Sequence, residues 1–143
     1  MGNRILSNSI FSNVELGIDL LAGGNRGPTA NDTGDIDTGP NGLQNKPVLS
    51  SAKKVTRTKT VIEGGLNSTP SKTFAVQFFS NPTGTSEGKK LLGQKSVTTD
   101  AGGDVTFSFS TKKKVSLGQA ITATATGAEG TSEFSAPKQV VRK

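Results

Sequence analysis

The chain has 143 residues, a hydrophobic content of 31% and a net charge of +6, and it contains no Cys, His, Trp or Tyr. Its length suits one ordinary domain, or one domain plus a substantial appendage. Without Cys or His, the sequence lacks the usual ligands of zinc, copper and haem, and also the Ser-His-Asp and Cys-His nucleophile systems. No stretch is long and apolar enough for a membrane-spanning helix, and no basic region followed by an apolar run marks a secretory signal.

Charge divides the chain near Lys46. Residues 1–45 hold two basic and five acidic side chains, a net charge of −3, whereas residues 46–143 hold 15 basic and six acidic side chains, a net charge of +9. Such asymmetry is typical of parts with different partners. We predict three units: a terminal β-helix-like coil (residues 1–30), a polar Asp/Asn/Gly linker (31–46) and an immunoglobulin-like β-sandwich (47–143).

The first unit carries Asn every five residues, at Asn3, Asn8 and Asn13. This spacing matches neither a helix nor a long strand, but it is typical of very short strands separated by tight corners, where Asn adopts left-handed backbone. The run GIDLL predicts one more short strand, from Ile18 to Leu21. Residues 3–21 amount to a single coil, whereas about three repeats are needed to bury a core.

This coil must therefore stack on its own sandwich, on upstream coils or on another subunit. Unpaired strand edges recruit other strands, so strand addition to a neighbouring copy would produce filaments. The alternative is that the segment packs on its own sandwich or frays. The candidate assembly residues are Asn3, Ile5, Asn8, Ile10, Asn13, Ile18 and Leu20.

From Pro47 onward, short alternating runs are separated by turns rich in Gly, Pro, Asn and Asp. Seven strands are predicted, in the runs PVLSSAKK, TVIEGGLN, KTFAVQFFSNP, KLLGQKSVTTD, DVTFSFSTK, QAITATATG and TSEFSAPKQVV. The alternation predicts an all-β fold, an immunoglobulin-like antiparallel β-sandwich of about seven strands preceded by a short β-helix-like N-terminal segment. The Cys–Trp–Cys signature of antibody domains is absent, so the prediction concerns architecture alone.

The linker holds the only dense cluster of oxygen ligands in the sequence. Calcium takes six to eight oxygens, several of them from carboxylates on a flexible loop. The twelfth position counted from Asp35 is Lys46, where an EF-hand requires Glu, so this is not an EF-hand. The alternative is a solvated connector whose Asp and Asn side chains cap their own backbone. The candidate calcium ligands are Asp32, Asp35, Asp37 and Asn41, with Asp19 as a further candidate.

Lys pairs and triplets recur in the basic part, most densely at Lys112, Lys113 and Lys114. Such a surface can bind an anionic polysaccharide, or its charges can protect sheet edges and loops from association. Nucleic-acid binding usually adds aromatic stacking platforms, and the only aromatic residues are seven Phe, mostly at core-like positions. We therefore expect no nucleic-acid partner.

No catalytic constellation is present in the sequence. Asp35 and Asp37 are alternate residues of one loop and cannot flank a sugar ring from two sides. A catalytic groove in a β-helix needs several stacked coils, and this chain has one. We therefore predict that the chain is not an enzyme.

Two segments resemble a known family. N-x-I-x-x-N-x-I-x-x-N with GIDL, followed by ND-x-GD-x-DTGPN-x-LQN-x-PVL, resembles the end of the right-handed parallel β-helix in large bacterial surface and secreted proteins. GGLNSTP, FAVQFFSNP, LLGQKSVTTDAGGDVTF and ITATATGAEGTSEFS resemble the immunoglobulin-like module that follows it.

This resemblance implies an extracellular or cell-surface location and a structural, adhesive or glycan-contacting role as a spacer, cap or display domain. The partners would be neighbouring domains or identical subunits. The alternatives are a self-assembling fibre subunit that uses the N-terminal segment, and an accessory module that binds anionic glycans.

Overall fold

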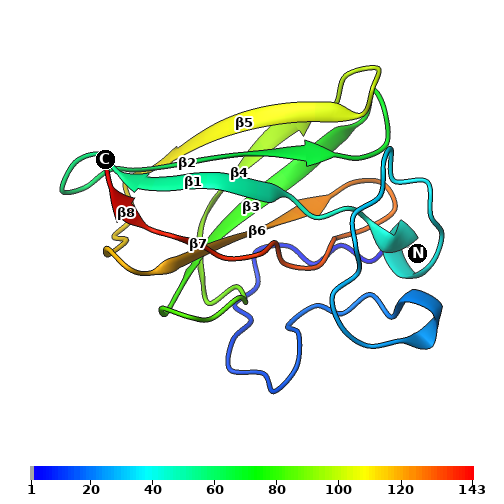
Figure 1. Cartoon of the computed structure of the whole chain (residues 1–143), viewed down its shortest axis with the longest axis horizontal. Helices are drawn as coiled ribbons and strands as arrows, with labels where there is room; N and C mark the ends of the chain where they lie inside the picture. The colour runs from blue at the N-terminus through cyan, green and yellow to red at the C-terminus, as the bar shows by residue number, and fades with distance from the viewer. Residues whose placement is uncertain (1) are drawn as a thin grey trace.

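The structure is a computed structural model that describes residues 2–143. It is all-β, with two four-stranded sheets packed around a shared core (Figure 1). The strands are β1 (Val48–Lys54), β2 (Thr60–Asn67), β3 (Thr73–Asn81), β4 (Lys90–Thr98), β5 (Asp104–Thr111), β6 (Ala120–Thr126), β7 (Lys138–Gln139) and β8 (Val141–Arg142). Two short 3-10 helices precede them, η1 (Ala22–Gly24) and η2 (Pro40–Leu43). Neither these nor any other helix within residues 2–143 has the length and apolar character to cross a membrane.

One sheet has the order β5-β2-β1-β8 and the other β4-β3-β6-β7. The pairings are antiparallel except that between β1 and β8, which is parallel. The first six predicted strands form where the alternating pattern places them, with ends that differ by one or two residues. Alternation is reliable here because each strand points one row of side chains into the core.

The seventh prediction, a single strand through TSEFSAPKQVV, is wrong. This run makes an isolated bridge from Thr131 to Thr126 and then two short strands, β7 paired with β6 and β8 paired with β1. Pro137 precedes β7 and has no backbone N–H to donate to a ladder. The buried Val140 stands between β7 and β8, where the chain passes from one sheet to the other.

The sandwich core is built from both sheets. Phe78 of β3 is fully buried; its ring stacks on Phe109 at a centroid distance of 4.4 Å and meets Phe107 edge-on at 5.5 Å. The remaining buried members of this cluster are Leu49, Ala52, Ile62, Leu66, Phe74, Val76, Leu92, Val97, Val115, Ile121, Ala123, Ala125 and Val140.

The outer face of the second sheet is also covered. In β6, the polar Thr122, Thr124 and Thr126 are as buried as the apolar residues between them. The N-terminal segment lies along this sheet, below it in the view of Figure 1. Isolated bridges from Asn3 to Gly130 and from Ile10 to Gly88 join it to the loops after β6 and before β4. A one-coil segment that cannot bury itself thus uses the sandwich as its partner.

No regular strand forms between Gly2 and Pro47, so the predicted strand from Ile18 to Leu21 is wrong. Ile18 and Leu20 are nevertheless buried, in a small second cluster with Leu43. The GIDLL run therefore marks a buried contact correctly. The backbone of this run is held by contacts with other parts of the chain rather than by hydrogen bonds to a neighbouring strand.

Candidate functional site

The linker, residues 31–46, folds back on itself beside the turn that follows β2. Asn45 is 1% exposed and holds the two sides of the linker together. Its Oδ1 accepts from the N–H of Asp32 at 3.0 Å, and its Nδ2 donates to the carbonyls of Asp32 and Asn67. The Asn67 side chain in turn accepts from the N–H of Gly34 at 2.8 Å. These bonds fix the loop that carries the three Asp residues.

Asp32, Asp35 and Asp37 are brought together by this loop. Each offers a carboxylate oxygen, and the three oxygens all lie within 4.8 Å of one another. Gly34 and Asp35 both have positive φ, 76° and 56°, and so turn the chain sharply between the first and second carboxylates. The clustering of these three predicted ligands is a feature of the structure; their occupation by calcium stays a prediction.

Asp35 is the best-connected carboxylate of the three. Its Oδ1 accepts from the N–H of Asn45 at 3.0 Å, and its Oδ2 accepts from Gln44 Nε2 at 2.9 Å and from the Ser68 hydroxyl. Burial nevertheless raises the pKa of Asp35 above its ordinary value of 3.8, with smaller contributions from the neighbouring carboxylates. The carboxyl group is thus held in place in a site that disfavours its charge.

Asp32 and Asp37 each keep a carboxylate oxygen without a partner. Asp32 Oδ2 accepts from the N–H of Ile36 at 3.0 Å, but Oδ1 of both Asp32 and Asp37 is buried and makes no hydrogen bond within residues 2–143. Burial, and next the charge of Asp32, raises the pKa of Asp37. An unsatisfied buried polar group costs about 1–3 kcal/mol. A hard cation between these oxygens would supply the missing partner and offset the repulsion.

Asn41, which the sequence predicts as a fourth calcium ligand, lies outside this cluster. Its Nδ2 donates to the carbonyls of Asn3 and Thr131, both at 3.0 Å, and its Oδ1 accepts from the N–H of Asn3 at 3.1 Å. A Cβ at Gly130 would come within 2.4 Å of this side chain, so the close approach requires Gly. Asn41 thus connects the N-terminal segment to the chain after β6.

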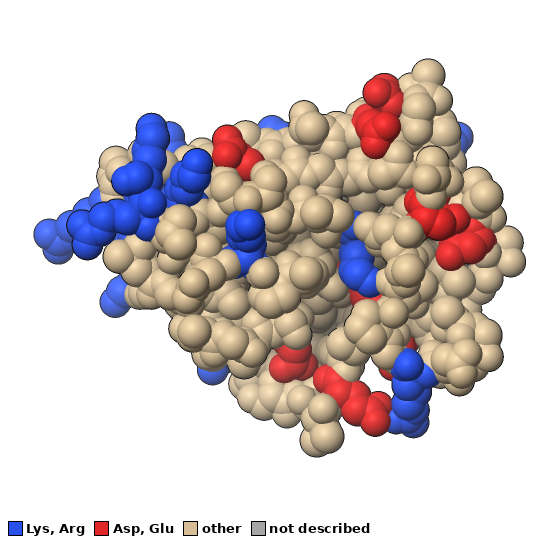
Figure 2. Space-filling model, in the orientation of Figure 1, with Lys and Arg blue, Asp and Glu red and all other residues tan. Residues whose placement is uncertain are grey.

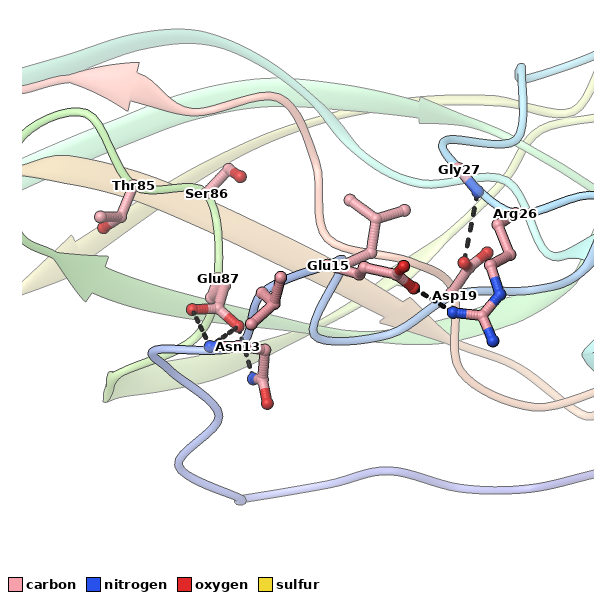
Figure 3. A pocket seen from close by; sticks show the side chains of 10 residues that line it. Asn13, Glu15, Asp19, Arg26, Gly27, Thr85, Ser86 and Glu87 are labelled. Atoms are coloured by element: carbon pink, nitrogen blue, oxygen red, sulfur yellow. Dashed lines mark hydrogen bonds and ion pairs between the residues drawn. The ribbon is translucent and has the colours of Figure 1, made fainter.

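Asp19 also lies apart, in the hollow of about 510 Å³ drawn in Figure 3. Its Oδ2 accepts from the N–H of Gly27 at 3.2 Å, and its Oδ1 is buried without a partner among the described residues. The other charged groups here already have partners. Glu15 forms an ion pair with Arg26, and Glu87 accepts from Asn13, as Figure 3 shows.

Glu133 is a buried charged side chain of this region that the sequence does not single out. It is 3% exposed and joins the N-terminal segment to the sandwich. Its Oε1 accepts from the N–H of Leu20 at 3.1 Å, and its Oε2 from the N–H of Thr29 at 2.9 Å and from Lys46 Nζ at 3.2 Å. The available signal was a lone carboxylate in TSEFS, a run otherwise without charge.

The candidate assembly residues lie mainly against the chain's own sandwich. The N–H of Ile5 donates to the Thr131 hydroxyl at 2.8 Å, and Ile10 exchanges two backbone bonds of 2.9 Å with Gly88. Asn3 binds Asn41, Asn13 binds Glu87, and Asn8 donates only to the nearby carbonyl of Leu6; Ile18 and Leu20 are buried. Packing on the chain's own sandwich, one of the three possibilities, is the arrangement in this structure. Strand addition to another subunit stays a prediction.

Comparison with known proteins gives little. No protein-family model matches the chain, and no curated protein matches it. Among solved structures, it is similar to a β-glucosidase from Kluyveromyces marxianus, at 15% identity and a TM-score of 0.35 over 68% of this chain. The chain spans 15% of the length of that protein. A likeness this weak carries no argument about fold or activity.

Proposed function

We propose that this chain is a non-catalytic structural or adhesive module of an extracellular bacterial surface or secreted protein, where it acts as a spacer, cap or display domain. The sequence resemblance supports the location. The contacts support a non-catalytic role, because in the hollow around Asp19 the Glu15 carboxylate is paired with Arg26 and the Glu87 carboxylate accepts from Asn13. A catalytic site would instead direct convergent polar groups toward a substrate.

Within this proposal the sandwich is immunoglobulin-like and the N-terminal segment is the end of a β-helix. The strand order supports the first part. β1, β2 and β5 share one sheet and β3, β6 and β7 share the other, as strands A, B and E and strands C, F and G do in immunoglobulin-like sandwiches. The segment's dependence on another element to cover its apolar side chains supports the second part.

The linker binds calcium in this proposal, and the cation fixes the N-terminal segment to the sandwich. The single observation that carries this step is the pair of buried, unpartnered oxygens, Oδ1 of Asp32 and Oδ1 of Asp37, in a cluster of three carboxylates. Because Asn45 donates to the carbonyl of Asp32 in the linker and to that of Asn67 at the end of β2, order at the carboxylates is transmitted directly to the sandwich.

The test is the melting temperature in calcium and in chelator. At a calcium concentration about 100 times the Kd, we expect a rise of roughly 5–10 °C, since binding then stabilises the folded state by about 2.7 kcal/mol. The double variant Asp35→Asn/Asp37→Asn should lose the rise. Glu63→Gln should retain the rise, because Glu63 lies on an exposed strand face and is not a member of the carboxylate cluster. Gln also keeps an acceptor for the Ser51 hydroxyl, so this control should fold. A rise that survives in the double variant would place the cation elsewhere, and no rise in the unmodified protein would exclude the site.

A further inference from the structure

Ten basic side chains from four segments meet at one end of the sandwich. The turn between β1 and β2, the loop between β5 and β6 and the C-terminal residues lie there, because Lys54 pairs with Thr60 and Arg142, and Thr60 pairs with Thr111. The start of β4 lies there too, because its Lys90 and Leu91 bond to the β5–β6 loop. Figure 2 shows the blue side chains gathered on the left, where Figure 1 places the C-terminus. The basic end consists of Lys53, Lys54, Arg57, Lys59, Lys90, Lys112, Lys113, Lys114, Arg142 and Lys143.

Carboxylates do not compensate this charge. Within residues 2–143 the ion pairs are Arg26 with Glu15 and Lys46 with Glu133, neither of which involves the basic end. Three of its ammonium groups donate to backbone carbonyls instead. Lys54 Nζ reaches Val115 O at 2.7 Å, Lys113 Nζ reaches Leu91 O at 2.9 Å, and Lys90 Nζ reaches Lys114 O at 3.4 Å. The remaining cations face solvent, and their mutual repulsion opposes folding.

The basic end also contains a hollow of the size of a ligand site. An open hollow of about 610 Å³ lies between the β1–β2 turn and the C-terminal residues. Four of the cations line it, Lys54, Arg57, Arg142 and Lys143, together with Leu117. This volume falls in the range of about 300–1,000 Å³ that is typical of ligand sites. A repeating anion could place one charged unit in the hollow while its chain continues over Lys112, Lys113 and Lys114.

We propose that the basic end binds an acidic polysaccharide, a linear polymer with carboxylate or sulfate groups. The proposal goes beyond the structural role because it uses a surface remote from the calcium cluster. Charges spread over four segments fit an extended polymer better than a single small anion. Eight of the ten cations are Lys, which acts as a point charge and so suits dispersed anions better than one anionic group held in the bidentate fork of an Arg.

A single-stranded nucleic acid and an anionic lipid surface fit this end of the sandwich less well. No aromatic residue lies among the residues lining the hollow, so a single-stranded nucleic acid would find no stacking platform there. Leu117 and Val141 are the large apolar residues of this end with substantial exposure, 44% and 48%. Two such side chains supply little of the apolar area that holds a protein in a lipid surface.

The experiment measures binding of heparin and polygalacturonate by calorimetry, in chelator so that calcium bridging cannot contribute. The test variant is Arg57→Gln/Arg142→Gln/Lys143→Gln, and the control is Arg4→Gln/Lys72→Gln/Lys95→Gln, which has the same net charge. Within the described residues the Lys and Arg side chains that donate hydrogen bonds or form ion pairs are Arg26, Lys46, Lys54, Lys90 and Lys113, and none of these is substituted, so both variants should fold. Circular dichroism and the melting temperature check this.

We expect wild-type binding that weakens steeply with salt, at least about a tenfold loss of affinity in the test variant, and less than a twofold loss in the control. Dextran, which is neutral, should not bind. An equal loss of affinity in both variants would show that net charge alone accounts for the binding, and this would overturn the proposal. Tighter binding to oligo(dT) or to phosphatidylserine vesicles than to both polysaccharides would also overturn it, as would the absence of polysaccharide binding at low salt.

Discussion

The sandwich and the N-terminal part are held together by different kinds of contact. The sandwich encloses fifteen buried apolar residues contributed by both sheets. Residues 2–47 contribute three, Ile18, Leu20 and Leu43, and otherwise depend on buried polar side chains such as Asn41, Asn45 and Glu133. Apolar burial is non-directional and tolerant, whereas a polar contact fails when one partner is lost. The N-terminal part should therefore respond to single polar substitutions, cations and pH, and the sandwich should not.

The largest expected effect is that of Phe78→Ala. Phe78 is fully buried between Phe107 and Phe109, so its removal leaves a cavity as well as lost apolar contact. We expect a loss of about 3–5 kcal/mol in the free energy of unfolding, measured by urea denaturation. Both parts should unfold together, because the N-terminal segment rests on β3. A loss below 1 kcal/mol would show that the sandwich core is not the main source of stability.

Glu133→Gln tests whether the N-terminal part depends on buried polar contacts. Gln keeps one acceptor oxygen, so at least one of the N–H groups of Leu20 and Thr29 loses its partner and Lys46 loses its ion pair. We expect a loss of about 1–3 kcal/mol that is confined to the N-terminal part. Hydrogen exchange should become faster at Leu20 and Thr29 and stay unchanged in β3. Glu129→Gln, on the exposed turn nearby, is the matched control and should change neither; equal loss of protection in β3 would remove the distinction between the two parts.

The smallest effect is a pH dependence that reverses with calcium. The pKa values of Asp35 and Asp37 are raised by burial, so in the metal-free protein their stabilising contribution is present below about pH 3.8 and lost as the pH rises through the raised values. Calcium binds the ionised carboxylates, so with calcium the contribution should grow over the same window. The readout is the difference in melting temperature between the wild type and Asp35→Asn/Asp37→Asn across pH. The same slope in calcium and in chelator would contradict a shared site.

The sequence predicts the strands well up to Thr126, because their alternation reports directly on which side chains face the core. It predicts the N-terminal segment poorly, because the partners of its backbone are distant side chains, as in the bond from Ile5 to Thr131. No local pattern encodes such a bond. The prediction of one continuous seventh strand fails for a related reason, since the chain passes from one sheet to the other at Val140.

The candidate site shows the same limit. The three Asp residues are close in sequence and are close in space, so spacing alone predicts the cluster. Asn41 is equally close in sequence, but it adopts a φ of 51° and its amide is used by Asn3 and Thr131. Spacing does not report side-chain direction. Glu133 is separated from Leu20 and Thr29 by more than a hundred residues, so its role becomes visible only in the folded chain.

Residue-resolved hydrogen exchange in calcium and in chelator tests most directly whether a cation holds the polar part of this molecule to the apolar part. We predict that calcium slows exchange at the N–H groups of Gly34, Ile36 and Asn45, which bond to Asn67, Asp32 and Asp35, and leaves β3 and β6 unchanged. Identical exchange at these three positions in both conditions, at calcium concentrations up to the millimolar range of weak extracellular sites, about 10⁻³ M, would contradict the account.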